Sequence, residues 1–219
     1  TGAATLDVNL LGPITIKKKG ATDLANNDIL AEQLVKVAYN EYKGAALDSY
    51  TEANYGQDDQ LNDIRTSIGQ SFTAATTSDL HSVSMYLKKD GSPTGTAAAK
   101  IYAHSGTYGT NSVPTGAALA TSDTLDVSTL TTSYAVKSFT FSGANRIGLT
   151  ATTQYVVQVE YTTGTAINRV WVGLDGTTPT HGGNASWYQA GWAASAGIDA
   201  VFYVYGWDKR FEMLSQIAN

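Results

Sequence analysis

The stretch from Gly69 to Gly206 consists of short segments of alternating apolar and polar residues, separated by turn-forming residues. Alternation with a period of two places every second side chain on the same face of a strand, so it predicts short strands with one buried face. The predicted strands are 69–72, 82–88, 98–102, 135–141, 155–161, 169–173 and 200–205. Turn sequences such as Asp90-Gly91-Ser92-Pro93 separate them. Because no long crossover helix is available to connect parallel strands, we predict an antiparallel β-sandwich of the jelly-roll or Greek-key kind.

The same alternation indicates which residues form the core. On each predicted strand one set of alternate side chains is apolar, as in Val83, Met85 and Leu87. Apolar faces of two sheets pack against each other because their burial removes apolar surface from water. We therefore predict that the inward-facing residues of the two sheets include Phe139, Phe141, Val157, Val159, Phe202 and Val204.

The composition agrees with one sheet-rich domain of low charge. Of the 219 residues, only 15% are charged and 42% are hydrophobic, and threonine, which is β-branched and suits strands, is abundant. The formal net charge is -5, and the one basic run is Lys17-Lys18-Lys19. Phosphate binding requires clustered Lys and Arg, so we do not expect nucleic acid as a partner.

The chain contains no cysteine, which excludes disulfides and thiolate metal sites. No apolar run approaches the roughly 20 residues of a membrane-spanning helix. The first residues, Thr1-Gly2-Ala3-Ala4, do not resemble a signal peptide. We expect a soluble protein without membrane insertion, whose export signal is either missing or already removed.

The N-terminal segment is predicted to contain two strands and one helix. Residues 6–10 and 14–16 alternate like strands. Between 28 and 42 the apolar period changes, and Leu30, Leu34 and Val37 fall on one helical stripe, which predicts an amphipathic helix. We assign residues 1–46 to an N-terminal attachment segment and residues 47–206 to the sandwich.

The C-terminal tail, residues 207–219, is predicted to be a short helix. Asp208 is a favourable helix-capping residue, and Phe211, Leu214 and Ile217 would share one helical face. An apolar stripe of this kind is buried either on its own sandwich or on a neighbouring subunit, and the sequence leaves both alternatives open.

Candidate catalytic and metal-binding residues are few. The three histidines, His81, His104 and His181, do not form a spaced metal-binding pair, and no sequence motif supports a Ser-His-Asp triad. Glu52, Asp58, Asp59 and Asp63 are close in sequence and could bind calcium through carboxylate oxygens, or they could form a solvated acidic linker. We expect no enzyme activity, no metal site and no cofactor other than this calcium alternative.

An aromatic segment follows His181-Gly182-Gly183-Asn184 and contains Trp187, Tyr188 and Trp192. Exposed aromatic rings can stack on the apolar face of a sugar while amide and imidazole groups bind its hydroxyls. The sequence therefore suggests a saccharide-binding site. In the alternative interpretation, the tryptophans close one end of the core. The candidate saccharide-binding residues are Trp187, Tyr188, Trp192, Asn184 and His181.

Several ordered motifs between Asp48 and Gly206 carry a resemblance to a known family. They are the sequences at 48–55, 68–73, 87–95, 99–102, 114–116, 119–122, 155–157 and 202–206. Together they resemble the jelly-roll modules, similar to carbohydrate-binding modules, of phage virion proteins and of bacterial surface proteins of the choice-of-anchor type. The resemblance implies a jelly-roll fold and carries no catalytic residues with it. Residues 1–46 and 207–219 fall outside it.

Two functions are consistent with these observations. The first is a non-catalytic structural protein of a phage particle, a head-decorating or fibre-like subunit with a projecting jelly-roll domain. Its partners would be other copies of itself and other virion proteins, and its location a virion surface or the extracellular space. The alternative is a carbohydrate-binding adhesin module of a virion or bacterial cell surface, with cell-surface glycans as partners. Segments outside the module favour the first, because repeated assemblies use such segments to bind their neighbours.

Overall fold

The computed structural model describes residues 5–6, 14–18, 24 and 34–217. The chain divides into two compact units. We call Ala45–Gly206 the sandwich unit, and we call Thr1–Gly44 together with Trp207–Asn219 the terminal unit. The sandwich unit is thus one continuous segment of chain that lies, in sequence, between the two parts of the terminal unit.

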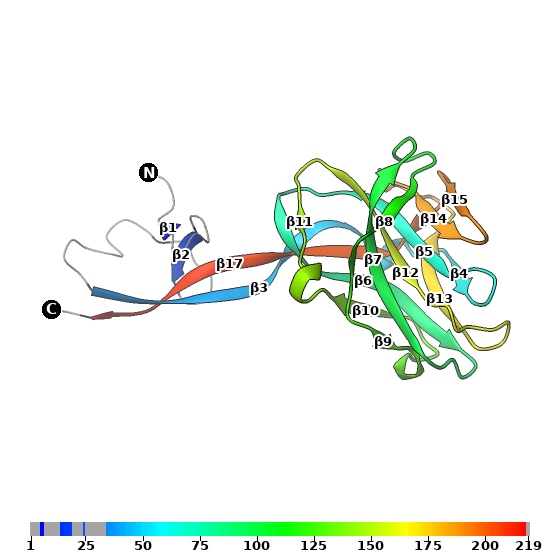
Figure 1. The fold of residues 1–219 in the computed structure, drawn as a ribbon, viewed down its shortest axis with the longest axis horizontal. Helices are drawn as coiled ribbons and strands as arrows, with labels where there is room; N and C mark the ends of the chain where they lie inside the picture. The colour runs from blue at the N-terminus through cyan, green and yellow to red at the C-terminus, as the bar shows by residue number, and fades with distance from the viewer. Residues whose placement is uncertain (1–4, 7–13, 19–23, 25–33, 218–219) are drawn as a thin grey trace. The chain divides into compact units, whose positions relative to one another are not determined.

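The first sheet of the sandwich unit is organised around β6 (Ser78–Asp90) (Figure 1). Four strands pair antiparallel with β6, namely β10 (Ala135–Thr140), β11 (Gly148–Leu149), β13 (Arg169–Asp175) and β17 (Phe202–Ile217). β4 (Gln57–Leu61) and β16 (Asp199–Ala200) pair with β13, and β3 (Leu34–Tyr50) pairs with β17. The pairs that β6 forms with these four strands, and those that β13 forms with β4 and β16, are all antiparallel.

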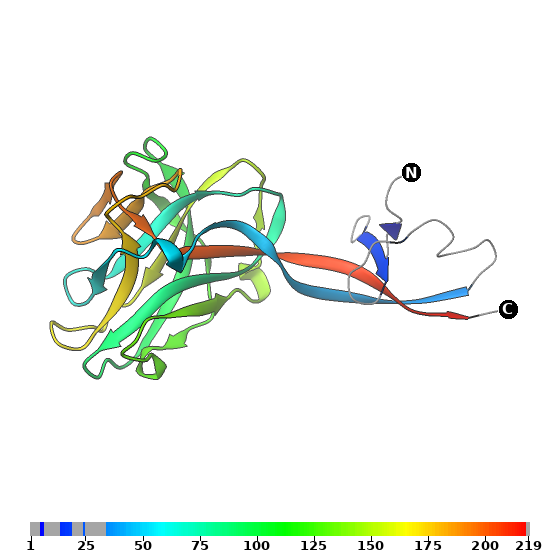
Figure 2. The same ribbon diagram turned by 180° about the vertical axis from the view of Figure 1, so that it is seen from behind.

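The second sheet has the strand order β15-β14-β5-β12-β7-β8, and β9 also pairs with β7 (Figure 2). Its strands are β5 (Ser67–Thr73), β7 (Thr96–Ser105), β8 (Val113–Thr121), β9 (Leu125–Asp126), β12 (Gln154–Glu160), β14 (Ala185–Tyr188) and β15 (Trp192–Ser195). Three single-turn helices, η1 (Glu52–Asn54), η2 (Val127–Thr129) and η3 (Gly143–Asn145), lie between strands. The sequence-based prediction of an all-β sandwich with two antiparallel sheets is confirmed.

The core lies between the two sheets and is contained within the sandwich unit. All members of its main cluster fall between Leu47 and Val204. Six of the seven predicted strands coincide with observed strands whose ends differ by a few residues, and the seventh, 200–205, overlaps the beginning of β17, which continues to Ile217. The core prediction is confirmed, because all six named residues, Phe139, Phe141, Val157, Val159, Phe202 and Val204, are buried.

The predicted N-terminal helix is wrong over the part that the structure describes. Residues 34–42 belong to β3, whereas residues 28–33 lie outside the described residues. The segment Val35-Lys36-Val37-Ala38-Tyr39 also fits a period of two, and its β-branched and aromatic residues favour strand. Pairing with β17 decides between the two patterns, since a strand needs a partner that a sequence window cannot show.

The predicted C-terminal helix is also wrong. β17 continues through the tail to Ile217, and residues 218–219 lie outside the described residues. In the terminal unit, β1 (Thr5–Leu6) pairs antiparallel with β2 (Ile14–Lys18), and β17 pairs in parallel with β2, with Phe211 beside Ile16. Backbone pairing on β17 therefore outweighs the helical spacing of its apolar residues.

The segment Val113-Pro114-Thr115-Gly116, whose proline and glycine predict a turn, is instead the beginning of β8. Proline is tolerated there because β8 ends the strand order of its sheet and an edge strand needs no N–H donor on its free side. A register shift between Ile101 and Ala103 of β7 accommodates this irregular start of β8, and Gly116 has a φ of 70°.

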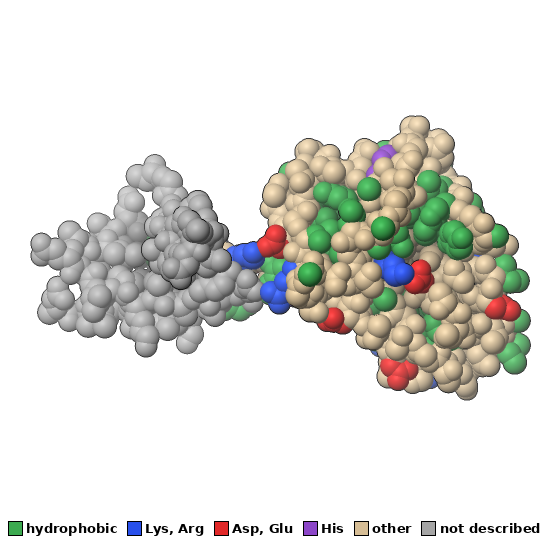
Figure 3. Space-filling view, in the orientation of Figure 1, with side chains coloured by type: hydrophobic (Ala, Val, Ile, Leu, Met, Phe, Trp, Pro, Cys, Tyr) green, Lys and Arg blue, Asp and Glu red, His purple; other side chains and the backbone are tan. Residues whose placement is uncertain are grey.

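Charged side chains are sparse on the face of the sandwich unit visible in Figure 3. Among the described residues, no helix has the length and apolar character needed to cross a membrane.

Candidate functional site

The segment that contains Trp187, Tyr188 and Trp192 forms a β-hairpin, although its sequence suggested a Gly-rich connection. β14 and β15 pair antiparallel with Tyr188 opposite Trp192, and Ala190 in the turn has a φ of 56°. β14 also pairs with β5, with Trp187 opposite Ile68. The hairpin therefore extends the second sheet, and successive residues along β14 lie on its opposite faces.

Trp187 lies on the core side of this sheet. It is partly buried and packs against the hydrophobic core. The guanidinium carbon of Arg65 lies 5.0 Å from the centroid of the Trp187 ring, which is the geometry of a cation–π contact. For this tryptophan the structure supports core closure, the alternative that the sequence had left open.

Tyr188 and Trp192 lie on the outer face of the same sheet and meet Tyr102 from β7. The ring centroids of Tyr188 and Trp192 are 5.0 Å apart at 69°, and those of Tyr102 and Trp192 are 5.9 Å apart at 67°. Tyr188 is 39% exposed. We call Tyr102, Tyr188 and Trp192 the outer aromatic cluster. Two of its members, Tyr188 and Trp192, belong to the predicted saccharide-binding site.

Curling of the second sheet brings these rings together. β7 and β14 are separated by β12 and β5 in the strand order, yet β15 lies close to β8, at the other end of that order. On this outer face, the polar side chains of Gln158 and Ser186 are fully buried. The amide Nε2 of Gln158 donates to Ser186 Oγ at 2.6 Å. Sequence reasoning placed Tyr102 on a strand but could not place it beside Trp192.

Charged groups adjoin the outer aromatic cluster. Lys100 Nζ donates to Glu160 Oε1 at 2.5 Å, and both residues belong to the outer face. Burial raises the pKa of Tyr102, an effect that Lys100 opposes and Glu160 reinforces. The Tyr102 phenol is therefore neutral near pH 7, and it can offer both a ring face and a hydroxyl donor.

Asn184 lies apart from the exposed aromatic rings, inside the protein. Its side chain is fully buried, its Oδ1 accepts from Ser112 N at 3.0 Å, and its Nδ2 donates to Ser112 O at 3.2 Å and to Ala185 O at 2.9 Å. The amide thus joins the segment before β8 to the start of β14. Its hydrogen-bonding capacity is used within the protein.

His181 faces inward to a buried polar network. The backbone N–H of Gly183 donates to His181 Nδ1 at 3.0 Å, so neutral His181 carries its proton on Nε2, which lies 3.2 Å from Asp48 Oδ1. Gln70 Nε2 lies 3.1 Å from Nδ1 and donates to Asp199 Oδ1 at 2.8 Å. The imidazole thus connects Asp48 near the end of β3 with Gln70 of β5 and with the backbone of Gly183.

Asp175 belongs to the same polar region. Burial alone would raise the pKa of its carboxyl group, but hydrogen bonds from the backbone of Thr177 and Thr178 and from the hydroxyls of Tyr50 and Thr177 lower it to about 2. Tyr50 Oη donates to Asp175 Oδ2 at 2.8 Å. The ionised carboxylate therefore holds the loop after β13 against the end of β3.

Three of the four acidic residues that suggested calcium, Glu52, Asp58 and Asp59, have protein partners. Asp58 Oδ2 accepts from Tyr134 Oη at 2.9 Å and from Lys88 Nζ at 3.2 Å. Asp59 forms an ion pair with Arg65, and Glu52 accepts from the Tyr203 hydroxyl. Within the part of the chain that the structure describes, no three His, Cys, Asp or Glu side chains are grouped as metal ligands.

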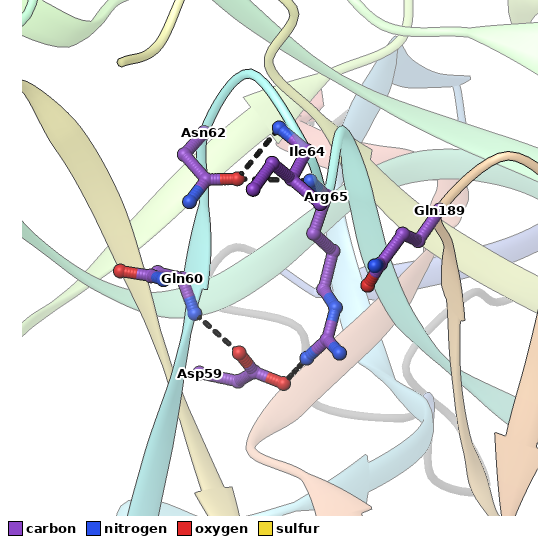
Figure 4. Close-up of a pocket in the computed structure, with 6 residues that line it drawn as sticks. All are labelled: Asp59, Gln60, Asn62, Ile64, Arg65 and Gln189. Carbon is purple, nitrogen blue, oxygen red and sulfur yellow. Dashed lines mark hydrogen bonds and ion pairs between the residues drawn. The ribbon is translucent and has the colours of Figure 1, made fainter. Parts of the chain in front are cut away.

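A polar pocket lies between β4 and the β14–β15 hairpin (Figure 4). Its volume is about 100 Å³, and its lining residues are Asp59, Gln60, Asn62, Ile64, Arg65 and Gln189. Asn62 Oδ1 accepts from the backbone N–H groups of Ile64 and Arg65 at 2.9 and 2.8 Å, which fixes the tight turn after β4. No sequence pattern predicted this pocket, because its two sides are more than 100 residues apart in the chain.

The predicted saccharide residues therefore occupy three environments. Tyr188 and Trp192 lie together on the outer face, Trp187 closes the core, and His181 and Asn184 are buried in polar contacts. No protein-family model matches the chain, and no curated protein matches it either. The fold and the site define a β-sandwich protein with an exposed aromatic cluster and a polar edge pocket.

Proposed function

We propose that this protein is a non-catalytic structural subunit of a phage particle, a head-decoration or fibre-like subunit. The terminal unit attaches it to other copies of itself and to other virion proteins, and the sandwich unit, a jelly roll, is displayed at the virion surface. The proposal rests on the resemblance of residues 48–206 to jelly-roll modules of virion proteins. It also rests on the division of the chain into two compact units, one of which can attach while the other is displayed.

The observation that carries the proposal is the insertion of the sandwich unit between the two parts of the terminal unit. Both chain ends belong to the terminal unit, so one unit can be held by neighbouring subunits while the other keeps its own fold. The main core cluster supports this separation, because all its members lie between Leu47 and Val204. Closed homo-oligomers commonly form through such added segments.

The experiment compares the full chain with residues 45–206, using size-exclusion chromatography with light scattering. We expect the full chain to assemble and the excised sandwich unit to stay monomeric, with the circular dichroism and cooperative unfolding of a folded sheet protein. Assembly of residues 45–206 to the same size as the full chain would refute the assignment of attachment to the terminal unit. A full chain that stays monomeric at every concentration, alone and with virion components, would refute the structural role.

A second candidate function is saccharide binding by the outer aromatic cluster, as in an adhesin module. The specific observation is the grouping of Tyr102, Tyr188 and Trp192 on one outer face beside the Lys100–Glu160 pair. Stacking on one or two sugar rings provides only a few kcal/mol, so a single site would bind with a Kd of about 1 mM to 0.1 mM. Many copies on one particle would raise the overall affinity.

Glycan-array binding of the assembled full chain tests this second function. We expect Trp192→Ala to abolish binding. Trp171→Ala is the matched control, because Trp171 is a partly buried tryptophan on β13 of the other sheet. Equal binding by both variants, or no bound glycan on the array, would remove the outer aromatic cluster as a saccharide site.

A further inference from the structure

The polar pocket of Figure 4 combines the Asp59 carboxylate, the Arg65 guanidinium and the side-chain amides of Asn62 and Gln189 around a small hollow. The Gln60 amide points away from the hollow, and its Oε1 accepts from Arg169 at 2.6 Å. Asp59 and Arg65 are its only charged lining residues, and they form an ion pair with each other. The pocket therefore has strong hydrogen-bond acceptors and donors but no net charge. This chemistry suits a neutral ligand whose groups both donate and accept hydrogen bonds.

The charged pair is held in place before any ligand arrives. Arg65 is fixed on one side by Asp59 and on the other by the Trp187 ring, 5.0 Å away. Asp59 Oδ1 also accepts from the backbone N–H of Gln60 at 2.7 Å. A site whose side chains are already ordered loses less conformational entropy on binding.

The opposite wall is formed by Gln189, from the turn of the hairpin. Gln189 is exposed, and its backbone N–H donates to Gly191 O at 3.0 Å, which fixes the turn. Figure 4 shows its amide on the far side of the hollow from Asn62 and beside Arg65. The amide of Gln189 can therefore reach a ligand without breaking a contact that stabilises the fold.

The size of the hollow limits what can enter it. A hollow of about 100 Å³ is smaller than the pockets of about 300–1,000 Å³ that enclose most of a drug-sized ligand. The hollow therefore suits one edge of a pyranose ring, with two neighbouring hydroxyl groups, while the rest of the ring stays outside. Ile64, which is 60% exposed, provides an apolar surface at the pocket for the C–H groups of the same ring.

We propose that this pocket binds the vicinal diol of a neutral saccharide. One hydroxyl donates to the Asp59 carboxylate, the neighbouring hydroxyl accepts from the Arg65 guanidinium, and the Gln189 amide contacts either of them. The pocket is separate from the outer aromatic cluster, since the two share no residue. The inference adds a binding activity to the structural role and does not depend on it.

The test is a titration of the 15N-labelled full chain with the methyl glycosides of glucose, galactose and mannose, followed by amide chemical shifts. We expect at least one of them to shift the signals of Arg65 and Gln189 at concentrations up to about 20 mM, well above the millimolar Kd of one weak site. Methyl glucuronide is the acidic comparison, and we expect it to bind no more tightly than the neutral glycosides, because the paired Asp59 and Arg65 leave the pocket without net charge.

Gln189→Ala should weaken the binding of the same glycoside at least about fivefold, a change of about 1 kcal/mol for one lost hydrogen bond. Gln154→Ala on β12 is the matched control and should leave it unchanged, as should Trp192→Ala, which reports on the outer aromatic cluster. Arg65→Lys, which keeps the charge but loses the planar fork, is a second variant and should also weaken binding. No shift with any neutral glycoside, tighter binding of methyl glucuronide, or binding insensitive to both Gln189→Ala and Arg65→Lys would overturn the proposal.

Discussion

Replacing Trp187 with alanine is expected to destabilise the sandwich unit by about 3 kcal/mol. A fully buried aromatic side chain removes about 150–250 Å² from water. Trp187 is only partly buried, so about 100 Å² is at stake, worth roughly 2.5 kcal/mol at about 25 cal/mol per Å². The cation–π contact with Arg65 adds about 0.5–1 kcal/mol. These two terms together give the expected loss.

Thermal and urea unfolding of residues 45–206, followed by circular dichroism, measures this loss. For a domain of this size each kcal/mol shifts Tm by roughly 2–4 °C, so we expect Tm to fall by about 6–12 °C. Trp192→Ala, on the outer face, is the comparison and should cost roughly 1 kcal/mol, because it loses ring contacts but leaves the core closed. A double-mutant cycle with Arg65→Met isolates the cation–π term.

The reasoning would be refuted if Trp187→Ala unfolded at the same temperature as the parent, or if Trp192→Ala were the more destabilised of the two. Either outcome would mean that the indole of Trp187 does not close the core. A coupling energy of zero between Arg65 and Trp187 would refute the cation–π contribution alone and would leave the burial argument intact.

Three further outcomes are expected. Phe141→Ala should lower the unfolding free energy by about 3–5 kcal/mol in urea titrations, because its side chain is completely buried, and an unchanged midpoint would contradict its place in the core. Gly183→Ala should cost about 1–3 kcal/mol in the same assay, since its Cβ would lie 2.0 Å from the backbone oxygen of Ser71, and full parental stability would show that the backbone can move apart there. The pKa of Asp175 is lowered from 3.8 to about 2 in the folded protein, so its stabilising effect is complete above about pH 5 and is lost as the pH falls towards 2. Asp175→Asn should flatten this part of the stability–pH curve, and an unchanged curve would exclude the carboxylate as its source.

The core strands could be predicted because their information is local. In Val157, Val159 and their neighbours, an apolar residue at every second position indicates both the strand and the face that packs into the main core, although the other face of β12 is buried as well. The two helices could not be rejected in the same way. The sequence around Val37 fits a period of 3.6 as well as a period of two, and pairing with the distant strand β17 decides for the strand.

The outer aromatic cluster and the pocket depend on contacts that no sequence window contains. Tyr102 meets Trp192 only because the second sheet curls, and Arg65 faces Gln189 only because β4 and the hairpin lie side by side at the edge of the sandwich. His181 and Asn184 were predicted to bind hydroxyls because they are polar residues in a Gly-rich segment. Their burial and internal hydrogen bonds could not be inferred from composition.

The pairing of β3 with β17 has a consequence for how such a protein can change. The chain enters the sandwich unit at Ala45 and leaves it after Gly206, on two strands that are neighbours in one sheet. A Cβ on Gly206 would lie 3.3 Å from Leu47, so the two ends of the inserted segment are close in space. Any domain whose own ends lie close together could be exchanged at these two positions by a single genetic replacement. The sandwich unit is therefore free to diversify, or to be substituted by design, while the sequence that forms the terminal unit stays unchanged.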